Sequence, residues 1–548
     1  MTDLLTTVAI MFIVAGPFLI FANRFDLPSV PFLIIAGLVA GLFVDDTDLI
    51  LELARYGIAL LVFTFGVQIS LSSVRTVLAD SEIAALGQIL VVGSLGIGFG
   101  VVLGIPVDDA VYLGVAVALS STIVGTALLQ TEIRRNLVRG RLAQSIQFVQ
   151  DLVGIAILLV LGAGTLAADP IATQVGYGVT LLLVAVVINR YLFEKIGGLA
   201  GDSDELLIIG VVSLLVAFIG AAELAGISII VGAFAAGLAV RHNPTEHLGL
   251  FNGITSIRDF FVAIFFVTLG MLVTSPTVEK LILVSGLLIL VAVVKPVLTT
   301  GILIYQGYEP RSATLASLSS DQVSEFALII LIEAWLLGIL TNQAVFDAII
   351  FAAAASMITS SLSRRYAEDI YQVVSAFGLY KQGNKQIDER SEMPDSISDH
   401  IIIVGYGRQG PKLANACRRL EQPYVVIEND PEEQNDVRAD NDAYVFGDAM
   451  EPYTWEKARV DSARLIISTV NSEPVSKQLI GFDFDADLIL RSDDVEKATA
   501  LLDSGALYVT VSDMLASEQL IKQLEALFDG ELTREELREK QQAELSLD

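Results

Sequence analysis

A single acidic residue, Asp151, stands near the middle of an apolar run that is long enough to cross a lipid bilayer. The run, residues 142–161, reads LAQSIQFVQDLVGIAILLVL, and about 20 apolar residues suffice for a transmembrane helix. A carboxylate inside a membrane costs about 2.5 kcal/mol or more, and such residues mark ion pathways, proton relays or paired charges. Two interpretations are open: Asp151 binds a transported cation and a proton in turn, or it pairs with a basic group to hold two helices together.

A second intramembrane charge, Lys295, lies in the apolar run VAVVKPVLTTGILI, beside Pro296, which loosens a helix. We expect Asp151 to be its partner, because removing one member of a buried ion pair leaves the other charge uncompensated. The arrival of a proton or a cation at Asp151 would then release Lys295. A carboxylate that holds either a proton or a cation, but not both, makes the exchange of the two obligatory.

The composition indicates a polytopic protein embedded in a lipid bilayer. The 548 residues are 53% hydrophobic, and the mean hydropathy of +0.64 is too high for a soluble chain of this length. The formal charge is −29, and an acidic C-terminal part argues against a nucleic-acid partner, since phosphates need a basic surface. One cysteine and three histidines form no metal-ligand cluster, so we expect no metal cofactor.

The alternation of apolar and polar runs predicts four segments: a membrane domain over residues 1–375, a polar linker at 376–398, an α/β nucleotide-binding domain at 399–520 and a charged tail at 521–548. About thirteen spans of bilayer length fit the membrane domain. The expected ranges are 4–22, 28–44, 54–71, 83–103, 109–129, 140–163, 173–194, 205–222, 226–240, 256–273, 278–304, 312–337 and 342–363.

Loop charges predict how the chain is oriented, because an odd number of spans puts the two termini on opposite sides. Loops on the side of the C-terminus carry Arg24, Arg75, Arg134, Arg135, Arg139, Arg141, Arg190, Lys195, Arg241, Arg311, Arg364 and Arg365. Loops on the other side carry Arg55 and Lys280 with Asp45, Asp46, Asp48, Asp108, Asp109 and Asp169. The positive-inside rule therefore places the N-terminus outside the plasma membrane and the C-terminal domain in the cytoplasm.

Two short matches indicate an internal repeat in the membrane domain. AGLVAGL at 36–42 is similar to GAFAAGL at 232–238, and FTFGV at 63–67 is similar to VTLGM at 267–271. Both pairs lie seven spans apart, so the two copies cross the membrane in opposite directions. Inverted repeats of this kind are typical of secondary transporters, whose sites lie near the bilayer midplane between discontinuous helices.

The repeat predicts where two helices break. LSSTIVG at 119–125 and SSDQVSEF at 319–326 are polar interruptions in apolar runs, again seven spans apart. Unwound backbone at that depth is tolerated where it is buried in protein or lines a wet cavity. Its carbonyls and hydroxyls can then replace the hydration shell of a cation. The alternative is that these Ser and Thr hydroxyls bond back to an unbroken helix. Glu325 could serve the ion site or tie the break to neighbouring backbone.

The membrane domain resembles the monovalent cation:proton antiporter-2 family. The resemblance lies in LSSTIVG at 119–125, GRLAQSIQFVQDL at 140–152, GAFAAG at 232–237, FFVAIFFVTLGM at 260–271, VVKP at 293–296 and QVSEFAL at 322–328. It implies a homodimer whose subunits each have an interface domain and a core with two crossed broken helices. It also implies that Asp151 is the ion and proton carboxylate, with Lys295 as its counter-charge. Ser121 and Thr122 then lie at the first break, and Gln322 and Glu325 at the second.

The pair Gln150–Asp151, in place of two adjacent acids, looks like the Kef-type potassium:proton branch of that family and implies electroneutral exchange. The chain departs from that branch at Val323–Ser324, where Gly-Gly is usual, and at Gln68, where an acid is usual. The loop from His242 to Arg258 lacks the acidic element of glutathione-gated members. The choice between potassium and sodium stays open.

After the linker, HIIIVGYGRQG at 400–410 reads as a strand that runs into the dinucleotide fingerprint Gly405-x-Gly407-x-x-Gly410. Glycines let the backbone approach a pyrophosphate at a helix N-terminus. Glu428 ends the next strand, where it can accept hydrogen bonds from a ribose diol and would repel the 2′-phosphate of NADP. The expected nucleotide-binding residues are Gly405, Tyr406, Gly407, Arg408, Gln409, Gly410, Glu428, Asp448, Ala449 and Thr469.

This segment resembles the N-terminal half of an RCK (TrkA-N) domain, with Gly-Asp-Ala after the third strand. The resemblance implies a Rossmann-like domain that dimerises, binds a nucleotide such as NAD(H), AMP, ADP or ATP, and regulates the transport unit. A purely structural module with an empty crevice is the alternative, because fold does not imply function.

The sequence favours a secondary antiporter of K⁺ or Na⁺ against protons, and no enzymatic activity. A nucleotide-gated potassium channel is the main alternative, but no TVGYG-like filter stretch occurs. A membrane-anchored NAD-dependent dehydrogenase is a third, but the chain offers no substrate domain and no evident catalytic His or Lys.

Overall fold

The computed structural model describes residues 4–25, 27–44, 46–68, 82–134, 137–162, 168–193, 195, 204–241, 248–376, 383–394, 396–482 and 484–546. The chain divides into two compact units. The membrane unit is Met1–Gln306 with Pro310–Phe377, and the sheet unit is Gly307–Glu309 with Gly378–Asp548. Some residues named from the sequence lie outside the described residues: Asp45, Arg75, Arg135, the loop residues 242–247, and the linker residues 377–382 and 395.

The described part of the membrane unit is helical. Its elements are α1 (Leu4–Arg24), α2 (Ser29–Ala40), α3 (Thr47–Gln68), α5 (Glu82–Val102), α6 (Val107–Ala118), α7 (Thr122–Leu128), α8 (Gln130–Arg134), α9 (Val138–Leu161), α10 (Ala168–Val187), η1 (Ile188–Leu192), α12 (Asp204–Leu224), α13 (Ile229–Ala239), α14 (Leu248–Leu272), α15 (Val278–Ile289), η2 (Leu290–Val294), α16 (Lys295–Tyr305), α17 (Pro310–Ser317), η3 (Leu318–Ser320), α18 (Glu325–Leu336), α19 (Gln343–Arg365) and α20 (Ala367–Ala376).

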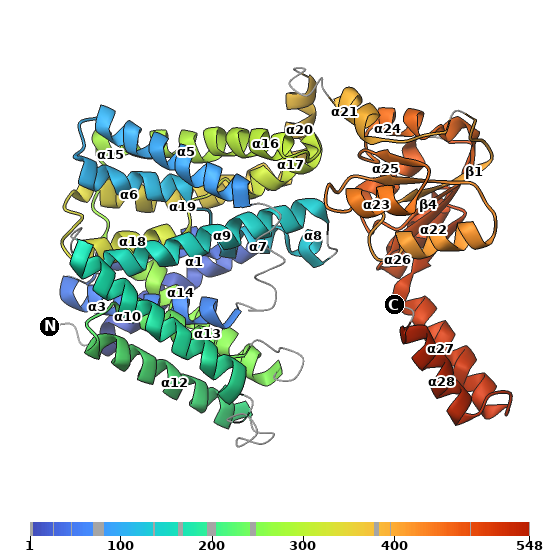
Figure 1. Ribbon diagram of the computed structural model, residues 1–548. Helices are drawn as coiled ribbons and strands as arrows, with labels where there is room; N and C mark the ends of the chain where they lie inside the picture. Colours follow the sequence, from blue (N-terminus) through green and yellow to red (C-terminus); the bar gives the residue numbers. More distant parts are fainter. Residues whose placement is uncertain are drawn as a thin grey trace. The chain divides into compact units, whose positions relative to one another are not determined.

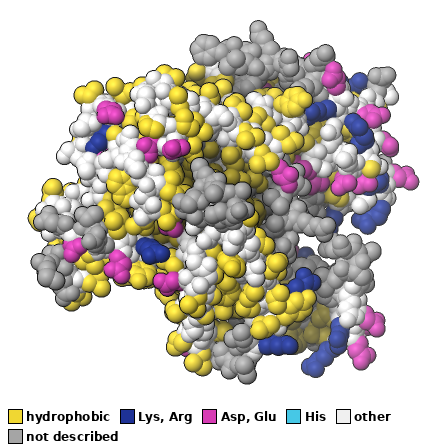
Figure 2. Space-filling view, turned by 60° about the vertical axis from the view of Figure 1, so that its left-hand side comes forward, with side chains coloured by type: hydrophobic (Ala, Val, Ile, Leu, Met, Phe, Trp, Pro, Cys, Tyr) yellow, Lys and Arg dark blue, Asp and Glu magenta, His cyan; other side chains and the backbone are white. Residues whose placement is uncertain are grey.

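Apolar helices occupy all thirteen expected ranges. Within the described residues, eleven helical segments are long and apolar enough to cross a bilayer, and the shorter apolar helices α2 and α13 fall in the two other ranges. Many large apolar side chains on these helices point outward, among them Leu183, Val216 and Val297, and apolar side chains cover much of the visible surface in Figure 2. A lipid-facing surface requires this pattern, because hydrocarbon cannot solvate polar groups. The number of helices that cross the membrane stays a prediction.

The helices of the membrane unit form two groups, which Figure 1 shows on opposite sides of α9 and α18. One group holds α5, α6, α15, α16, α17 and α19, and the other holds α3, α10, α12, α13 and α14. Within the first group α5 packs on α6, and α15 packs on α19. Within the second group α3 packs on α13 and on α14, and α2 packs on α14 from beside the group.

Glycine contacts confirm the inverted repeat. A Cβ atom at Gly37 of α2 would lie 2.1 Å from Val267 O and 2.8 Å from the Cα atom of Gly270 in α14. A Cβ atom at Gly237 of α13 would lie 2.1 Å from Phe63 O and 2.9 Å from the Cα atom of Gly66 in α3. The two contacts have the same geometry and are equivalent under the repeat, because α2 matches α13 and α14 matches α3 in sequence. Small residues let the helix backbones approach this closely.

Both predicted helix breaks are present. The first break lies between α6 and α7, where Leu119 is extended with φ −87° and ψ 147°. The second lies between η3 and α18, where Ser324 has φ −76° and ψ 147°. Each following half-helix starts with a serine cap: Ser121 Oγ accepts from Val124 N at 3.1 Å, and Ser324 Oγ accepts from Phe326 N at 2.9 Å. Caps of this type replace the missing backbone acceptors at a helix start.

The sheet unit contains one parallel six-stranded sheet with strand order β3-β2-β1-β4-β5-β6. The strand order reverses between β1 and β4. In sheets of this type the ligand-binding crevice lies at that switch point. Its elements are α21 (Gly383–Arg390), β1 (His400–Val404), α22 (Gly410–Arg419), β2 (Tyr424–Glu428), α23 (Gln434–Asp440), β3 (Tyr444–Phe446), α24 (Pro452–Lys457), η4 (Val460–Ser462), β4 (Ala463–Ser468), α25 (Glu473–Gly481), β5 (Asp487–Ser492), α26 (Val495–Asp503), β6 (Tyr508–Val511), α27 (Ser512–Phe528) and α28 (Arg534–Ser546).

The central strand β1 shows why the sheet has helices on both faces. Ile402 and Val404 point into one apolar cluster, and Ile401 and Ile403 point into another. A parallel strand buried on both faces reads as a continuous apolar run, which is what the sequence HIIIV contains. The Rossmann-like fold expected from the sequence is therefore confirmed. Helix α27 continues through residue 520, the expected end of the domain.

Replacement of Gly237 by Ala is expected to destabilise the membrane unit by about 1–3 kcal/mol, because the added Cβ overpacks a helix contact. The clash is with the backbone oxygen of Phe63, which cannot move without α3. The measurement is the thermal unfolding midpoint of the detergent-purified chain. The control is Gly220→Ala in α12, where a Cβ meets no atom within 4 Å. Equal midpoints for the two variants would contradict the close α3–α13 contact.

Candidate functional site

Helix α9 brings Gln150 and Asp151 against the first helix break. Both side chains are buried, with exposures of 0% and 1%. Thr122 Oγ1 donates to Asp151 Oδ2 at 2.5 Å, and the backbone N–H of Ser120 donates to Gln150 Oε1 at 2.8 Å. The structure therefore brings together Gln150, Asp151 and Thr122, as the sequence predicted. Ser121 lies between the two contacts and caps α7 with its hydroxyl.

Glu325 reaches the same half-helix from the second break. Its Oε1 accepts from the backbone N–H of Ile123 at 2.8 Å. Asp151 and Glu325 thus bind adjacent residues at the N-terminus of α7, and Glu325 itself starts α18. Helix N-termini carry a partial positive charge that stabilises carboxylates. Of the two roles left open for Glu325, the structure shows the tie to backbone.

Lys295 contacts both breaks but not Asp151. Its Nζ donates to Leu119 O at 2.9 Å and to Gln322 O at 3.1 Å, and among the described residues no ion pair joins Lys295 to Asp151. This differs from the expected pair. The physical reason is that Leu119 follows the C-terminus of α6 and Gln322 follows η3, where free carbonyls carry partial negative charge. An ammonium group with three donors satisfies them directly.

Side-chain amides join the two breaks to each other. Gln322 Nε2 donates to Ser121 O at 3.1 Å and to Ser319 O at 3.2 Å, and its Oε1 accepts from Ser360 Oγ at 3.0 Å. Gln147 Nε2, one turn before Asp151, also donates to Ser319 O, at 3.3 Å. The crossing of the two broken helices is therefore held by specific hydrogen bonds.

Several buried polar atoms at the crossing have no hydrogen-bond partner. They are Gln147 Oε1, Gln150 Nε2, Asp151 Oδ1, Ser320 Oγ, Asp321 Oδ1, Asp321 Oδ2 and Glu325 Oε2. Leaving a buried polar atom unpaired costs about 1–3 kcal/mol, so this cluster is arranged for a partner that is not a protein group. Carboxylate and amide oxygens suit a hard cation, a proton or water.

Three members of this cluster, Gln147, Ser320 and Asp321, received no role from the sequence. Gln147 lies four residues before Asp151, so the two side chains share one face of the helix. This spacing is a signal that can be read from the sequence. Asp321 is an acid within the predicted second break, which is itself a signal.

The glycine-rich loop of the sheet unit has the geometry that the fingerprint predicts. Gly405 has φ +91°, and a Cβ there would lie 2.6 Å from Thr469 Oγ1. A Cβ at Gly410 would lie 2.4 Å from Gly405 O, so the start of α22 packs tightly on the loop. A Cβ at Gly407 meets no atom within 4 Å. The loop therefore leaves open space at Gly407, next to a helix N-terminus that suits a pyrophosphate.

Glu428 lies at the end of β2 with an exposure of 7%. One carboxylate oxygen accepts from Tyr406 N, and the other accepts from Asn429 N at 2.7 Å and Asp430 N at 2.9 Å. Burial is the main cause that raises the pKa of Glu428 to about 7; the charge of Asp430 adds to it, and these N–H donors act against it. In this conformation Glu428 holds the glycine-rich loop, and its contact with a ribose stays a prediction.

The other expected nucleotide residues differ in what their side chains do. Arg408 and Gln409 are exposed on the loop, whereas the Tyr406 side chain is buried and its hydroxyl donates to Asp440 Oδ2 at 3.2 Å. Tyr406 can therefore offer a ligand only its backbone. Asp448 Oδ1 accepts from the backbone N–H of Met450 at 2.9 Å. The backbone oxygen of Ala449 accepts from the indole N–H of Trp455.

One basic residue at this edge was missed. Arg491, at the C-terminal end of β5, donates from Nη1 to Thr469 O at 3.2 Å and to Gln409 Oε1 at 3.4 Å. Its positive charge lies beside the glycine-rich loop, where phosphates would bind. Its position near the C-terminal end of a parallel strand is a sequence signal for a ligand-binding residue, because ligands bind at that edge of such sheets.

Comparison with known proteins gives matches for both units. The family described as sodium/hydrogen exchanger, transmembrane, matches residues 8–365, and the TrkA-N domain matches residues 401–511. YbaL of Escherichia coli (strain K12), named as a candidate cation/proton antiporter, is 26% identical over 97% of this chain and 99% of its own. The glutathione-regulated potassium-efflux system protein KefC of Enterobacter sp. (strain 638) is 26% identical over 84% of this chain and 74% of its own. The sodium proton antiporter MjNhaP1 from Methanocaldococcus jannaschii has 15% identity and a TM-score of 0.48, over 67% of this chain and 98% of its own.

Replacement of Glu428 by Gln is expected to flatten the pH dependence of the stability of the sheet unit. Because its pKa is about 7 when folded against an ordinary 4.5, the folded state keeps a proton that the unfolded state releases. The wild-type unit therefore loses stability as the pH rises between these values, on the order of 3 kcal/mol in total. The measurement is urea unfolding of the full chain below and above this window.

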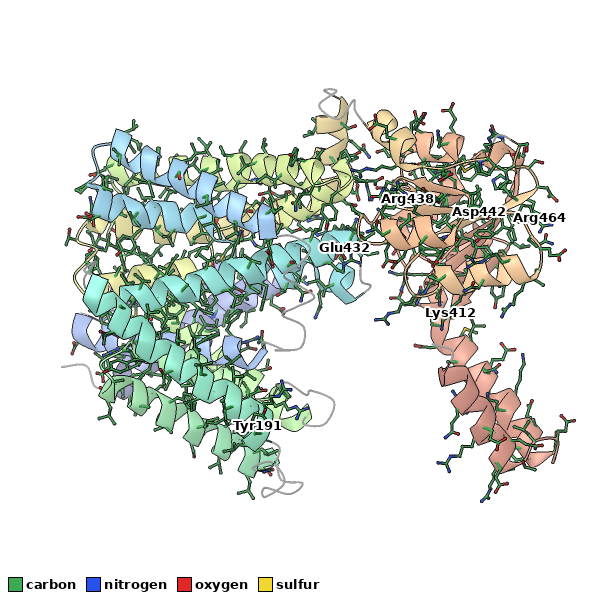
Figure 3. All side chains as sticks on the ribbon, viewed as in Figure 1. Tyr191, Lys412, Glu432, Arg438, Asp442 and Arg464 are labelled. Carbon is green, nitrogen blue, oxygen red and sulfur yellow. The ribbon has the colours of Figure 1, made fainter. Side chains whose placement is uncertain are left out.

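The control for this experiment is Glu432→Gln, an exposed position on the loop after β2, which Figure 3 labels. It should keep the wild-type pH dependence. A Glu428→Gln variant with the same pH dependence as wild type would contradict the assignment.

Proposed function

Because the chain belongs to the sodium/hydrogen exchanger family and carries a TrkA-N domain, we propose that it is a secondary antiporter that exchanges a monovalent cation for a proton. The family expected from the sequence is thereby confirmed. The observation that carries the proposal is the pair of buried carboxylates, Asp151 and Glu325, at the N-terminus of one half-helix. Each has one oxygen bound to that half-helix and one oxygen without a partner.

The free oxygens of Asp151 and Glu325 would bind the cation, while Gln150 positions the first break by accepting from Ser120 N. Thr122 and Ile123 orient the two carboxylates, and the N-terminal dipole of α7 keeps the site from carrying an uncompensated negative charge. A proton on Asp151 removes the charge that attracts the cation. Cation and proton therefore compete for the same oxygens, and one can leave on a given side only when the other replaces it.

Lys295 has a different task in the proposed mechanism. It compensates the negative ends of α6 and η3 and holds the two breaks together through Leu119 O and Gln322 O. We propose one-for-one, electroneutral exchange, because Gln150 leaves Asp151 as the only acid at the centre of α9. KefC is named for potassium efflux, which supports K⁺ as the cation, with Na⁺ as the alternative to be compared directly.

The sheet unit is proposed to regulate this exchange by binding a nucleotide, NAD(H) or an adenine nucleotide such as AMP, ADP or ATP. The open space at Gly407, the N-terminus of α22 and the charge of Arg491 support binding of the phosphates. We further propose a homodimer in the plasma membrane with the N-terminus outside, and no catalytic activity. A nucleotide-gated channel is not favoured, because the family match over the membrane unit is to exchangers.

Replacement of Asp151 by Asn is expected to abolish cation flux driven by a pH gradient in proteoliposomes, because an amide exchanges no proton at this site. The assay compares K⁺ and Na⁺ with wild-type protein at matched reconstitution. The control is Asp259→Asn, on an exposed carboxylate of α14, which should keep wild-type flux. Flux retained by Asp151→Asn would refute the assignment of the site.

Replacement of Gly407 by Ala is expected to weaken NADH binding to the purified chain by about tenfold, which equals about 1.4 kcal/mol. The added methyl group meets no protein atom, so it fills ligand space without disturbing the fold. The measurement is a fluorescence titration, repeated with AMP in competition. Gly481→Ala, at a position in α25 that is also open within 4 Å, is the matched control. Unchanged affinity for both nucleotides would remove this loop from the binding site.

A further inference from the structure

Asp321 is a buried acid that the proposed exchange mechanism does not use. It follows η3 directly at the second helix break and has an exposure of 0%. Neither of its carboxylate oxygens has a hydrogen-bond partner. An ionised carboxylate without water or donors is among the most costly groups a protein interior can hold. Such a residue must bind a proton or be compensated by a neighbouring charge.

The surroundings of Asp321 differ from those of the Asp151–Glu325 pair. Asp151 and Glu325 lie at a positive half-helix end and have hydrogen-bond donors from Thr122 and Ile123. Asp321 follows a C-terminal helix end, whose partial charge is negative and disfavours a carboxylate. Its position therefore gives it no stabilisation from the helix dipole.

The charged groups at the crossing form two electrostatic pairs. On α9 and α18, the charge of Glu325 acts on Asp151. On α16, Lys295 is the charge that acts on Asp321, and Asp321 is the charge that acts on Lys295. Helix α19 offers Asp321 only the hydroxyls of Ser360 and Ser363. The ionised form of Asp321 thus depends on the ammonium group of Lys295.

We propose that Asp321 is a second proton-exchanging carboxyl of the membrane unit, coupled to Lys295 and separate from the cation site at Asp151 and Glu325. When its O–H bond breaks, the proton leaves to water and the new negative charge is compensated by Lys295. When Asp321 takes up a proton from water, Lys295 is left with the two backbone carbonyls alone. No other reactant is needed for either step.

This coupling would make Asp321 a positioning residue, because it acts through Lys295 and not on the cation. Lys295 joins Leu119 O of the first break to Gln322 O of the second. Gln322 is also the residue next to Asp321 in the chain. A change of charge at Asp321 therefore changes how strongly Lys295 holds the two half-helix ends, and with it the rate at which the core rearranges. This consequence for the rate rests on the proposed antiport.

The first test of this inference does not depend on transport. The infrared difference spectrum between acidic and alkaline pH shows the C=O band of each carboxyl that exchanges a proton, and it is recorded on the purified full-length chain. Asp321→Asn should lose one such band, and Asp321→Glu should keep it at a shifted position. Spectra identical to wild type in both variants would overturn the inference. If the Asn variant does not fold, the band shift in Asp321→Glu decides the question.

The second test measures exchange in proteoliposomes as a function of pH. In Asp321→Asn, Lys295 loses the anion that favours its charged form. The ratio of the exchange rate at alkaline pH to that at acidic pH should therefore be about tenfold lower than in wild type, the equivalent of one pH unit. Asp321→Glu should restore the wild-type profile, and Asp259→Asn should not alter it. A superimposable Asn profile, or a complete loss of flux at every pH, would overturn the separate role. Absence of exchange in wild type would refute the proposed antiport. The infrared bands would still show whether Asp321 exchanges a proton.

Discussion

Four half-helix ends meet inside the membrane unit, and each of them needs a compensating charge that water cannot supply there. The positive N-terminus of α7 is met by the carboxylates of Asp151 and Glu325, and Glu325 also lies in the first turn of α18, the fourth end. The negative ends of α6 and η3 are met by the ammonium group of Lys295. In a low-dielectric interior these charges and dipoles stabilise one another. The same charges that make the broken helices possible leave carboxylate oxygens free for an ion, so structure and proposed transport rest on one electrostatic arrangement.

The rest of the membrane unit keeps this arrangement in place. Amide side chains such as Gln322 join the two breaks directly. At a distance from the site, the equivalent glycine contacts of Gly37 and Gly237 bring α2 close to α14 and α13 close to α3. The loop chemistry of the sheet unit is independent of this arrangement and rests on the close contact of Gly405 with Gly410 and on the carboxylate of Glu428.

Much of the fold could be predicted because its signals are local. Runs of apolar residues give the helices, and the continuous apolar strand HIIIV before three spaced glycines gives the Rossmann-like unit. The partner of Lys295 could not be predicted, because a long flexible side chain can reach several groups and backbone carbonyls leave no mark in a sequence. Asp321 received no role for a related reason: the full burial of its carboxylate beside only two hydroxyls is visible only in three dimensions. The alternative of unbroken helices could be decided only by backbone geometry at residues such as Leu119.

In the proposed mechanism the cation and the proton compete for one set of carboxylate oxygens. The most direct measurement is the apparent KM for the transported cation in proteoliposomes, determined over a range of pH values at saturating driving force. Competition predicts that KM rises by up to about tenfold for each unit by which the pH falls, whatever change in the maximal rate the titration of Asp321 adds. A KM that does not change with pH, with only the maximal rate varying, would contradict competition at Asp151.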